Sequence, residues 1–189
     1  MNFSRTLRSA VLAGVTVAAL AACSAPANEL PNTVAGQLPD LTSLGLTSFE
    51  CGSGDAIGGS FQEPKDPYVA ECWKGSPQGK TFLDIANSTQ ASVIQATGGS
   101  DATSDACPED SLSSAGGISC RAALVTKGSQ MVLVRTVVVL ADPSAALTGL
   151  PQNPTQDQIN EKISGAAVEV LVGTQPTSDG TTPKPSASS

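Results

Sequence analysis

The chain contains no histidine, and this absence excludes several kinds of chemistry. Without an imidazole there is no Ser-His-Asp or Cys-His catalysis, no histidine metal ligand and no histidine pH switch. The Ser-x-x-Lys pair of some histidine-free hydrolases does not occur in the chain either. We therefore expect no catalytic residue, no metal and no cofactor, and a role that is not enzymatic.

Aromatic and basic residues are also scarce. Aromatic side chains make up 3% of the chain, whereas surfaces that stack sugars or bases need several of them. The formal net charge is −7, and it becomes −9 once Arg5 and Arg8 leave with the N-terminal segment described next. An acidic protein is poorly suited to phosphate backbones, so we expect no nucleic-acid partner.

No apolar run is long enough to span a bilayer, which takes about 20 residues. The run from Ala10 to Ala22 has 13 residues, follows two positive charges and ends in small residues. This combination is typical of a secretory signal peptide, so we expect residues 1–22 to be removed. The mature chain would then keep 167 of the 189 residues.

The end of the signal segment reads Leu20-Ala21-Ala22-Cys23. This tetrapeptide resembles the lipobox of exported lipoproteins of the actinobacterial type. The resemblance implies that Cys23 is acylated on sulfur, becomes the new N-terminus and anchors the protein to the outer face of the cell membrane. The alternative is an ordinary secreted protein with a chance cysteine at the cleavage site.

Composition divides the mature chain into three parts. Residues 23–40 contain the cysteine that we expect to be acylated and a stretch rich in proline, alanine and asparagine, which we expect to be a flexible tether. Residues 174–189 consist almost wholly of small polar residues and proline, which predicts a disordered tail. Residues 41–173 remain as a single domain.

Four further cysteines, at positions 51, 72, 107 and 120, are expected to form disulfides because the protein is exported. Three pairings are possible. We favour Cys51–Cys72 and Cys107–Cys120, since each closes a modest loop rich in glycine, serine and aspartate. A four-cysteine zinc site is the alternative, but such sites usually contain closely spaced cysteine pairs and no Cys-x-x-Cys occurs.

Hydrophobic periodicity and turn residues predict an α+β fold, in which two main helices cover one face of an antiparallel sheet. The strand at 130–141 is nearly continuous in apolar residues and is expected in mid-sheet, joined to its neighbour by a turn at 127–129. The final helix would start at a capping box, Thr155 with Gln158, and end at Gly173. The expected elements are strand 68–73, helix 82–97, strands 120–126 and 130–141, and helix 155–173.

Several motifs suggest a site, and each also has a structural explanation. Gly75–Thr81 ends in Gly-Lys-Thr like a P-loop but has three residues between its glycines instead of four, so we interpret it as a turn in which Thr81 caps a helix. The glycine-rich segment 52–60 fits a disulfide-pinned surface loop. Trp73 and Arg121 each neighbour a strand cysteine, where they either contribute to packing or line a cleft between sheet and helices.

Acidic residues form two candidate groups. Glu50, Glu63, Asp66 and Glu71 could supply a carboxylate pair for glycoside cleavage. The group Asp101, Asp105, Glu109 and Asp110 could bind Ca²⁺, although it lacks the EF-hand spacing and fits a solvated loop better.

Residues 107–172 are also similar to the extracellular sensor domain of certain mycobacterial receptor kinases. The similarity lies in Cys107, the run from Cys120 to Val125, the valine-rich strand and the following helix. It implies an α/β unit with two disulfides and a ligand cleft. This chain has no kinase, so only fold and cleft would carry over.

Three functions remain open from the sequence. The first is a non-enzymatic envelope lipoprotein that binds a protein partner or a small apolar ligand. Its contact surfaces would be the loops at 52–60, 98–118 and 142–154, since recognition residues concentrate on loops. The second is a carrier of lipid or cell-wall precursors, with strand 131–140 lining an apolar cavity. The third is a histidine-free carboxylate enzyme.

Overall fold

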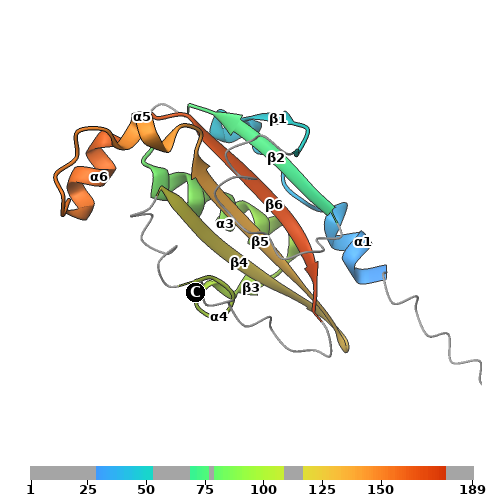
Figure 1. Ribbon diagram of the computed structural model, residues 1–189. Coiled ribbons are helices and arrows are strands. Elements are labelled where there is room, and N and C mark those ends of the chain that lie inside the picture. The colour runs from blue at the N-terminus through green and yellow to red at the C-terminus, as the bar shows by residue number, and fades with distance from the viewer. Residues whose placement is uncertain (1–28, 53–68, 77–78, 109–116, 178–189) are drawn as a thin grey trace, which may run out of the picture.

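The computed structural model describes residues 29–52, 69–76, 79–108 and 117–177. It shows a six-stranded sheet in the order β1-β2-β6-β5-β4-β3, with every pair of neighbours antiparallel (Figure 1). The expected α+β class is therefore confirmed. In chain order the elements are α1 (Glu29–Ala35), the 3-10 helix η1 (Thr42–Leu44), β1 (Thr47–Phe49), β2 (Val69–Gly75), α3 (Phe82–Thr97), β3 (Ser100–Asp101), α4 (Thr103–Ala106), β4 (Ile118–Lys127), β5 (Gln130–Leu140), α5 (Pro143–Leu147), α6 (Gln156–Lys162) and β6 (Val168–Pro176).

The long hairpin of β4 and β5 lies at the centre of the fold. Its register runs from Ile118 opposite Val139 to Lys127 opposite Gln130, and Gly128 makes the turn with a φ of +62°. Residues 132–140 are all buried, although successive side chains in a strand point to opposite faces. The sheet is thus covered on both sides of β5, as its continuous apolar sequence predicted.

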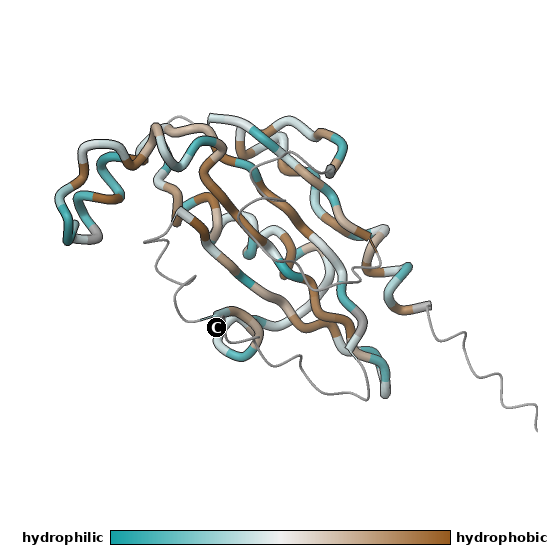
Figure 2. Tube along the Cα trace, in the orientation of Figure 1, coloured by the Kyte–Doolittle hydropathy of each residue, from teal (hydrophilic) through white to brown (hydrophobic). Residues whose placement is uncertain are grey.

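One face of the sheet, called here the helix face, holds the main core. Leu30 and Val34 of α1 and Ile85 and Val93 of α3 pack there with side chains of the central strands, including Val138. Figure 1 shows α3 behind the sheet, and Figure 2 shows apolar residues concentrated on the central strands.

The opposite face, called here the disulfide face, carries two smaller apolar clusters. One contains Cys72, Val137, Val139 and Leu171. The other surrounds the second disulfide and consists of Ala102, Ala106, Cys107, Cys120, Ala122 and Leu133. Both disulfides therefore lie against the same face of the sheet, away from α3.

Helix α3 has the bounds and the caps that its sequence predicts. Thr81 accepts from the backbone N–H of Asp84 at 3.1 Å, and the Asp84 carboxylate accepts from the N–H of Thr81 at 2.8 Å. These two bonds satisfy orphan donors of the first turn. At the other end, Gly98 adopts the left-handed conformation with a φ of +68°, which glycine tolerates without strain.

The connection between β5 and β6, residues 141–167, forms a helical arm that contains α5 and α6. It leaves the sheet at the end opposite α1 (Figure 1). Ile159 of α6 and Ile163, the residue that follows α6, are buried in the main core cluster, against which Leu147 and Leu150 also pack. The remaining arm residues that the structure describes are largely polar or small.

The prediction of a helix over 155–173 is wrong in its second half. The capping box of Thr155 and Gln158 is present, but α6 ends at Lys162 and β6 begins at Val168. The run Val-Glu-Val-Leu-Val also fits a strand, and its place between β2 and β5 buries Val168, Val170 and Val172 on the helix face. Pairing on both edges outweighs the local helical pattern.

Parts of the segments assigned to the tether and the tail lie in a helix and a strand. Residues 29–35, assigned to the tether, form α1, because Leu30 and Val34 find an apolar surface on the sheet at 4% and 0% exposure. Residues 174–176, assigned to the tail, complete β6 and pair with β5. Both segments are weakly patterned by themselves and gain order from distant strands.

Candidate functional site

The anchor candidate Cys23 lies outside the described residues, so its acylation stays a prediction. Five residues, 24–28, separate it from the start of α1 at Glu29. None of the helices in the described part of the chain is long and apolar enough to cross a membrane.

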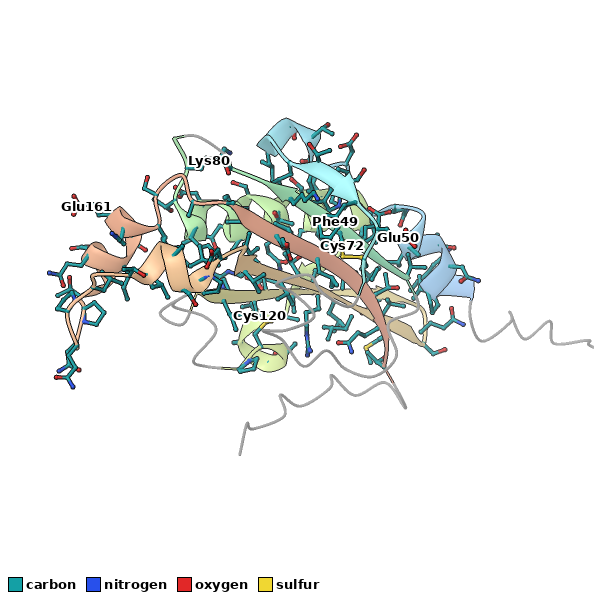
Figure 3. All side chains as sticks on the ribbon, turned by 45° about the horizontal axis from the view of Figure 1, so that its top comes forward. Phe49, Glu50, Cys72, Lys80, Cys120 and Glu161 are labelled. Carbon is teal, nitrogen blue, oxygen red and sulfur yellow. A yellow bond between two sulfur atoms is a disulfide. The ribbon has the colours of Figure 1, made fainter. Side chains whose placement is uncertain are left out.

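The two favoured disulfides are confirmed. Cys51–Cys72 joins the residues after β1 to β2, with an S–S distance of 2.07 Å, and Cys107–Cys120 joins the end of α4 to β4 at 2.05 Å. Figure 3 shows their sulfur atoms beside the labelled Cys72 and Cys120. Cys51 is exposed, whereas the other three cysteines are buried. These pairings rule out the alternative zinc site.

Trp73 and Arg121 lie on the same face of the sheet but do not line one cleft. Trp73 is on β2 and Arg121 is on β4, with β6 and β5 between them. Trp73 is 7% exposed within the main core, and its Nε1 has no hydrogen-bond partner in the part of the chain that the structure describes. Both side chains therefore contribute to packing.

Arg121 forms a polar cluster with the first half of α3. Its Nε donates to Asn87 Oδ1 at 3.0 Å, and its Nη1 donates to Ser119 Oγ at 3.0 Å and to the Cys120 carbonyl at 2.7 Å. Burial lowers the pKa of Arg121, and the nearby Asp101 carboxylate opposes this change. The half-buried guanidinium is thus held against β4 by three hydrogen bonds.

The same cluster satisfies the outer edge of β4, which the two-residue strand β3 only partly covers. The Ala122 carbonyl accepts from the N–H of Ala102 and from Gln90 Nε2, and the Ala122 N–H donates to Thr103 Oγ1. Side chains that occupy an edge in this way prevent another strand from pairing there. This polar cluster is thus explained by the fold and needs no ligand.

Of the acidic group considered for Ca²⁺, the structure describes Asp101 and Asp105. Asp101 Oδ1 accepts a hydrogen bond from the N–H of Thr103 at 2.9 Å. The hydrogen bonds from Thr103 lower the pKa of Asp101 most, and the charge of Arg121 and the hydrogen bond from Gln90 lower it further. Glu109 and Asp110 lie outside the described residues. Among the residues that are described, no group of three or more side chains is placed to bind a metal ion.

Of the carboxylates proposed as an enzymatic pair, Glu63 and Asp66 lie outside the described residues. Glu50, labelled in Figure 3, is exposed just after β1. Glu71 is half-buried on the helix face of β2. Burial raises the pKa of Glu71, and the charge of Asp40 raises it further. Asp40, which the sequence did not single out, has a lowered pKa because Thr42 donates to it.

The Glu71→Gln variant should therefore be more stable than the wild type at pH 7. The melting temperature should rise by only about 1–2 °C, because solvent screens the charge of this partly exposed side chain. A carboxyl whose pKa is raised by folding stabilises while protonated, below 4.5, and this contribution is lost as pH rises through the folded-state pKa. The gain should disappear at pH 4. Thermal melts at both pH values test this, with Glu161→Gln on the exposed face of α6 as the control.

Arg135, which the sequence analysis did not single out, is buried. Arg135 of β5 points to the disulfide face at 8% exposure, and its Nη2 donates to the Ala106 carbonyl at 2.8 Å. This bond ties α4 to the centre of the sheet beside the Cys107–Cys120 bridge. A lone charge inside an otherwise apolar strand was the signal that could have identified it.

Among the described residues, strand β5 lines no accessible cavity on the helix face. Val132, Val134 and Val138 on the helix face are each 0% exposed. A cavity wide enough for water would leave accessible area on the side chains around it. These valines thus belong to the core.

Comparison with known proteins gives no match. No protein-family model fits the chain, no curated protein resembles it in sequence and no solved structure resembles it in fold. The similarity of residues 107–172 to receptor-kinase sensor domains stays a prediction, and function has to be argued from the chain itself.

Proposed function

We propose that the protein is an exported lipoprotein, anchored through acyl chains on Cys23 to the outer face of the cell membrane, and that its domain binds another envelope protein without catalysing a reaction. The signal-peptide pattern and the Leu20–Cys23 motif support the anchor. The two disulfides support an oxidising compartment.

The observation that carries the binding role is the position of the helical arm relative to the anchor. A residue extends the chain by at most about 3.6 Å, so residues 24–28 would keep α1 within about 20 Å of an anchored Cys23. The arm, residues 141–167, leaves the opposite end of the sheet (Figure 1). It would face away from the membrane, where a partner can reach it, and it includes the 142–154 loop expected to make contacts.

The carrier and enzyme alternatives have less support. A carrier needs an apolar cavity, but the central valines of β5 have no accessible surface on the helix face. An enzyme needs converging catalytic groups, and the described carboxylates offer only Glu71 and Asp40 near the surface. Burial and the charge of Asp40 account for the raised pKa of Glu71, and hydrogen bonds from Thr42 account for the lowered pKa of Asp40. A bound lipid would nevertheless favour the carrier, and native mass spectrometry of the gently purified domain would show its extra mass.

A photo-reactive amino acid placed in the arm tests the binding role in the living host. At the exposed position Gln152 it should yield one discrete cross-linked product. At Ser129, exposed in the β4–β5 turn at the other end of the sheet, the same group should yield none. Equal labelling at both positions, or no product at Gln152, would count against a partner on the arm.

A further inference from the structure

The two disulfides differ in how far solvent reaches them. Cys107 and Cys120 are 3% and 0% exposed, and their bridge lies in an apolar cluster with Ala106 of α4. In the other bridge Cys72 is 4% exposed, whereas Cys51 is exposed. Solvent therefore reaches one half of the Cys51–Cys72 bridge and neither half of the other. Exposed disulfides exchange readily with thiols, while buried cysteines are inert.

The Cys51–Cys72 bridge also lies at one side of the sheet rather than at its centre. Cys51 is the second residue after β1, which has three residues and pairs with β2 at the end of the strand order. Figure 3 shows the sulfur atoms at Cys72, close to the labelled Phe49 and Glu50. A small molecule in solution can therefore approach Cys51 without separating any of the central strands.

Access also determines which sulfur of this bridge is attacked. In thiol–disulfide exchange a thiolate attacks one sulfur, from the side opposite the other, and the other sulfur leaves. For attack on Cys51 that side points away from the buried partner. For attack on Cys72 it would lie within the buried cluster of Val137, Val139 and Leu171. The exposed Cys51 is therefore the sulfur that an external thiol can reach.

Cys72 would then leave as a thiolate, and a cation lies on its side of the sheet. Phe49 is directly opposite Cys72 on β1, and Lys74 is two residues along β2 on the same face. The Lys74 ammonium lies 5.0 Å from the centre of the Phe49 ring. Glu169 is opposite Lys74 on β6, across β2 from Phe49, so it partly offsets this charge. A nearby ammonium stabilises a thiolate, so Lys74 should assist its release to a modest extent.

We propose that Cys51 is a thiol-exchange site, at which a low-molecular-weight thiol forms a mixed disulfide with the protein. The thiolate attacks Cys51 Sγ, a new S–S bond forms there, and the Cys51–Cys72 bond breaks. The electron pair of the broken bond stays on Cys72 Sγ, which takes up one proton from solvent. One disulfide is exchanged for another, so the step needs no oxidant or reductant besides the thiol. This modification does not depend on the lipid anchor or on a binding partner.

Peptide mapping of the folded protein tests the proposal. After treatment with glutathione, acid quenching and digestion with pepsin, one added glutathione should appear on Cys51, with Cys72 as a free thiol. The Cys51–Cys72 bridge should open about tenfold or more faster than the Cys107–Cys120 bridge. In denaturant, which removes the difference in access, both bridges should open at similar rates. Equal rates in the folded protein, or adducts on Cys72 as often as on Cys51, would overturn the proposal.

Two single-cysteine variants give a matched comparison that does not depend on how quickly the bridge closes again. Cys72→Ser leaves Cys51 as a thiol, and Cys51→Ser leaves Cys72. With oxidised glutathione, the Cys51 thiol should be modified about tenfold or more faster than the Cys72 thiol. Circular dichroism spectra like that of the wild type would show that both variants fold. Similar rates in two folded variants would contradict selective access to Cys51.

The contribution of Lys74 has its own test in the chain with both bridges. Lys74→Gln should slow the opening of the Cys51–Cys72 bridge by glutathione about twofold, because the leaving thiolate loses a nearby cation. Lys127→Gln, an exposed position at the far end of β4, is the matched control and should leave the rate unchanged. Equal rates in the two variants would contradict assistance by Lys74.

Discussion

Replacing Cys23 with alanine should abolish attachment of the protein to the membrane. Each buried methylene of an acyl chain contributes about 0.8 kcal/mol, so two or more chains hold a protein firmly and their loss releases it. The described helices provide no other span that could replace the anchor. We expect the variant to incorporate no labelled fatty acid and to move from the membrane fraction to the medium, because Ala21 and Ala22 still form a small-residue cleavage site.

The control for this experiment is a variant that lacks two other cysteines. Cys51→Ser/Cys72→Ser leaves the lipobox intact, so it should keep the fatty-acid label even if it is less stable. If the Cys23→Ala protein is labelled as strongly as the wild type, Cys23 is not the acylated residue.

Removing the Cys107–Cys120 bridge should have the largest effect on stability. The cysteines are 13 residues apart, and loops of this size gain about 3 kcal/mol from a disulfide, mainly by restricting the unfolded chain. For a domain of this size the Cys107→Ser/Cys120→Ser variant should melt about 6–12 °C lower. Thermal unfolding with and without reductant measures the change.

The second bridge gives a comparison that separates two contributions. Cys51 and Cys72 are 21 residues apart, so chain entropy alone predicts a similar or slightly larger effect for their removal. However, Cys107 and Cys120 are both buried in an apolar cluster, and the Arg135 bond to Ala106 adjoins them. We expect the Cys107→Ser/Cys120→Ser loss to be the greater, and the opposite order would show that packing around this bridge adds little.

The parts of the fold that the sequence predicts are those specified by neighbouring residues. Helix α3 carries its own cap at Thr81 and its stop at Gly98. The β4–β5 hairpin has a continuous apolar strand and a turn at Gly128. The disulfides follow because each joins cysteines that are close in sequence within an exported chain.

The parts that the sequence misses depend on distant partners. The run 168–172 fits either a helix or a strand, and β6 is a strand because β2 and β5 pair with both of its edges. Helix α1 is only seven residues long, too short to be stable alone, and it depends on the sheet beneath Leu30 and Val34. Strands β1 and β3 have three and two residues, which leaves no pattern to detect.

The same distinction applies to the candidate sites. The sequence could list Glu71 but could not show that Asp40, more than thirty residues earlier, would raise its pKa. It could list Arg121 but not its bond to Asn87 of α3.

The measurement that tests the account most directly is the intact mass of the protein extracted from its host's membrane. We expect a chain that begins at Cys23, carries acyl chains on that residue and gains about four hydrogens when its two disulfides are reduced. A mature chain without acyl chains, or one that begins at another residue, would contradict a lipid-anchored binding protein.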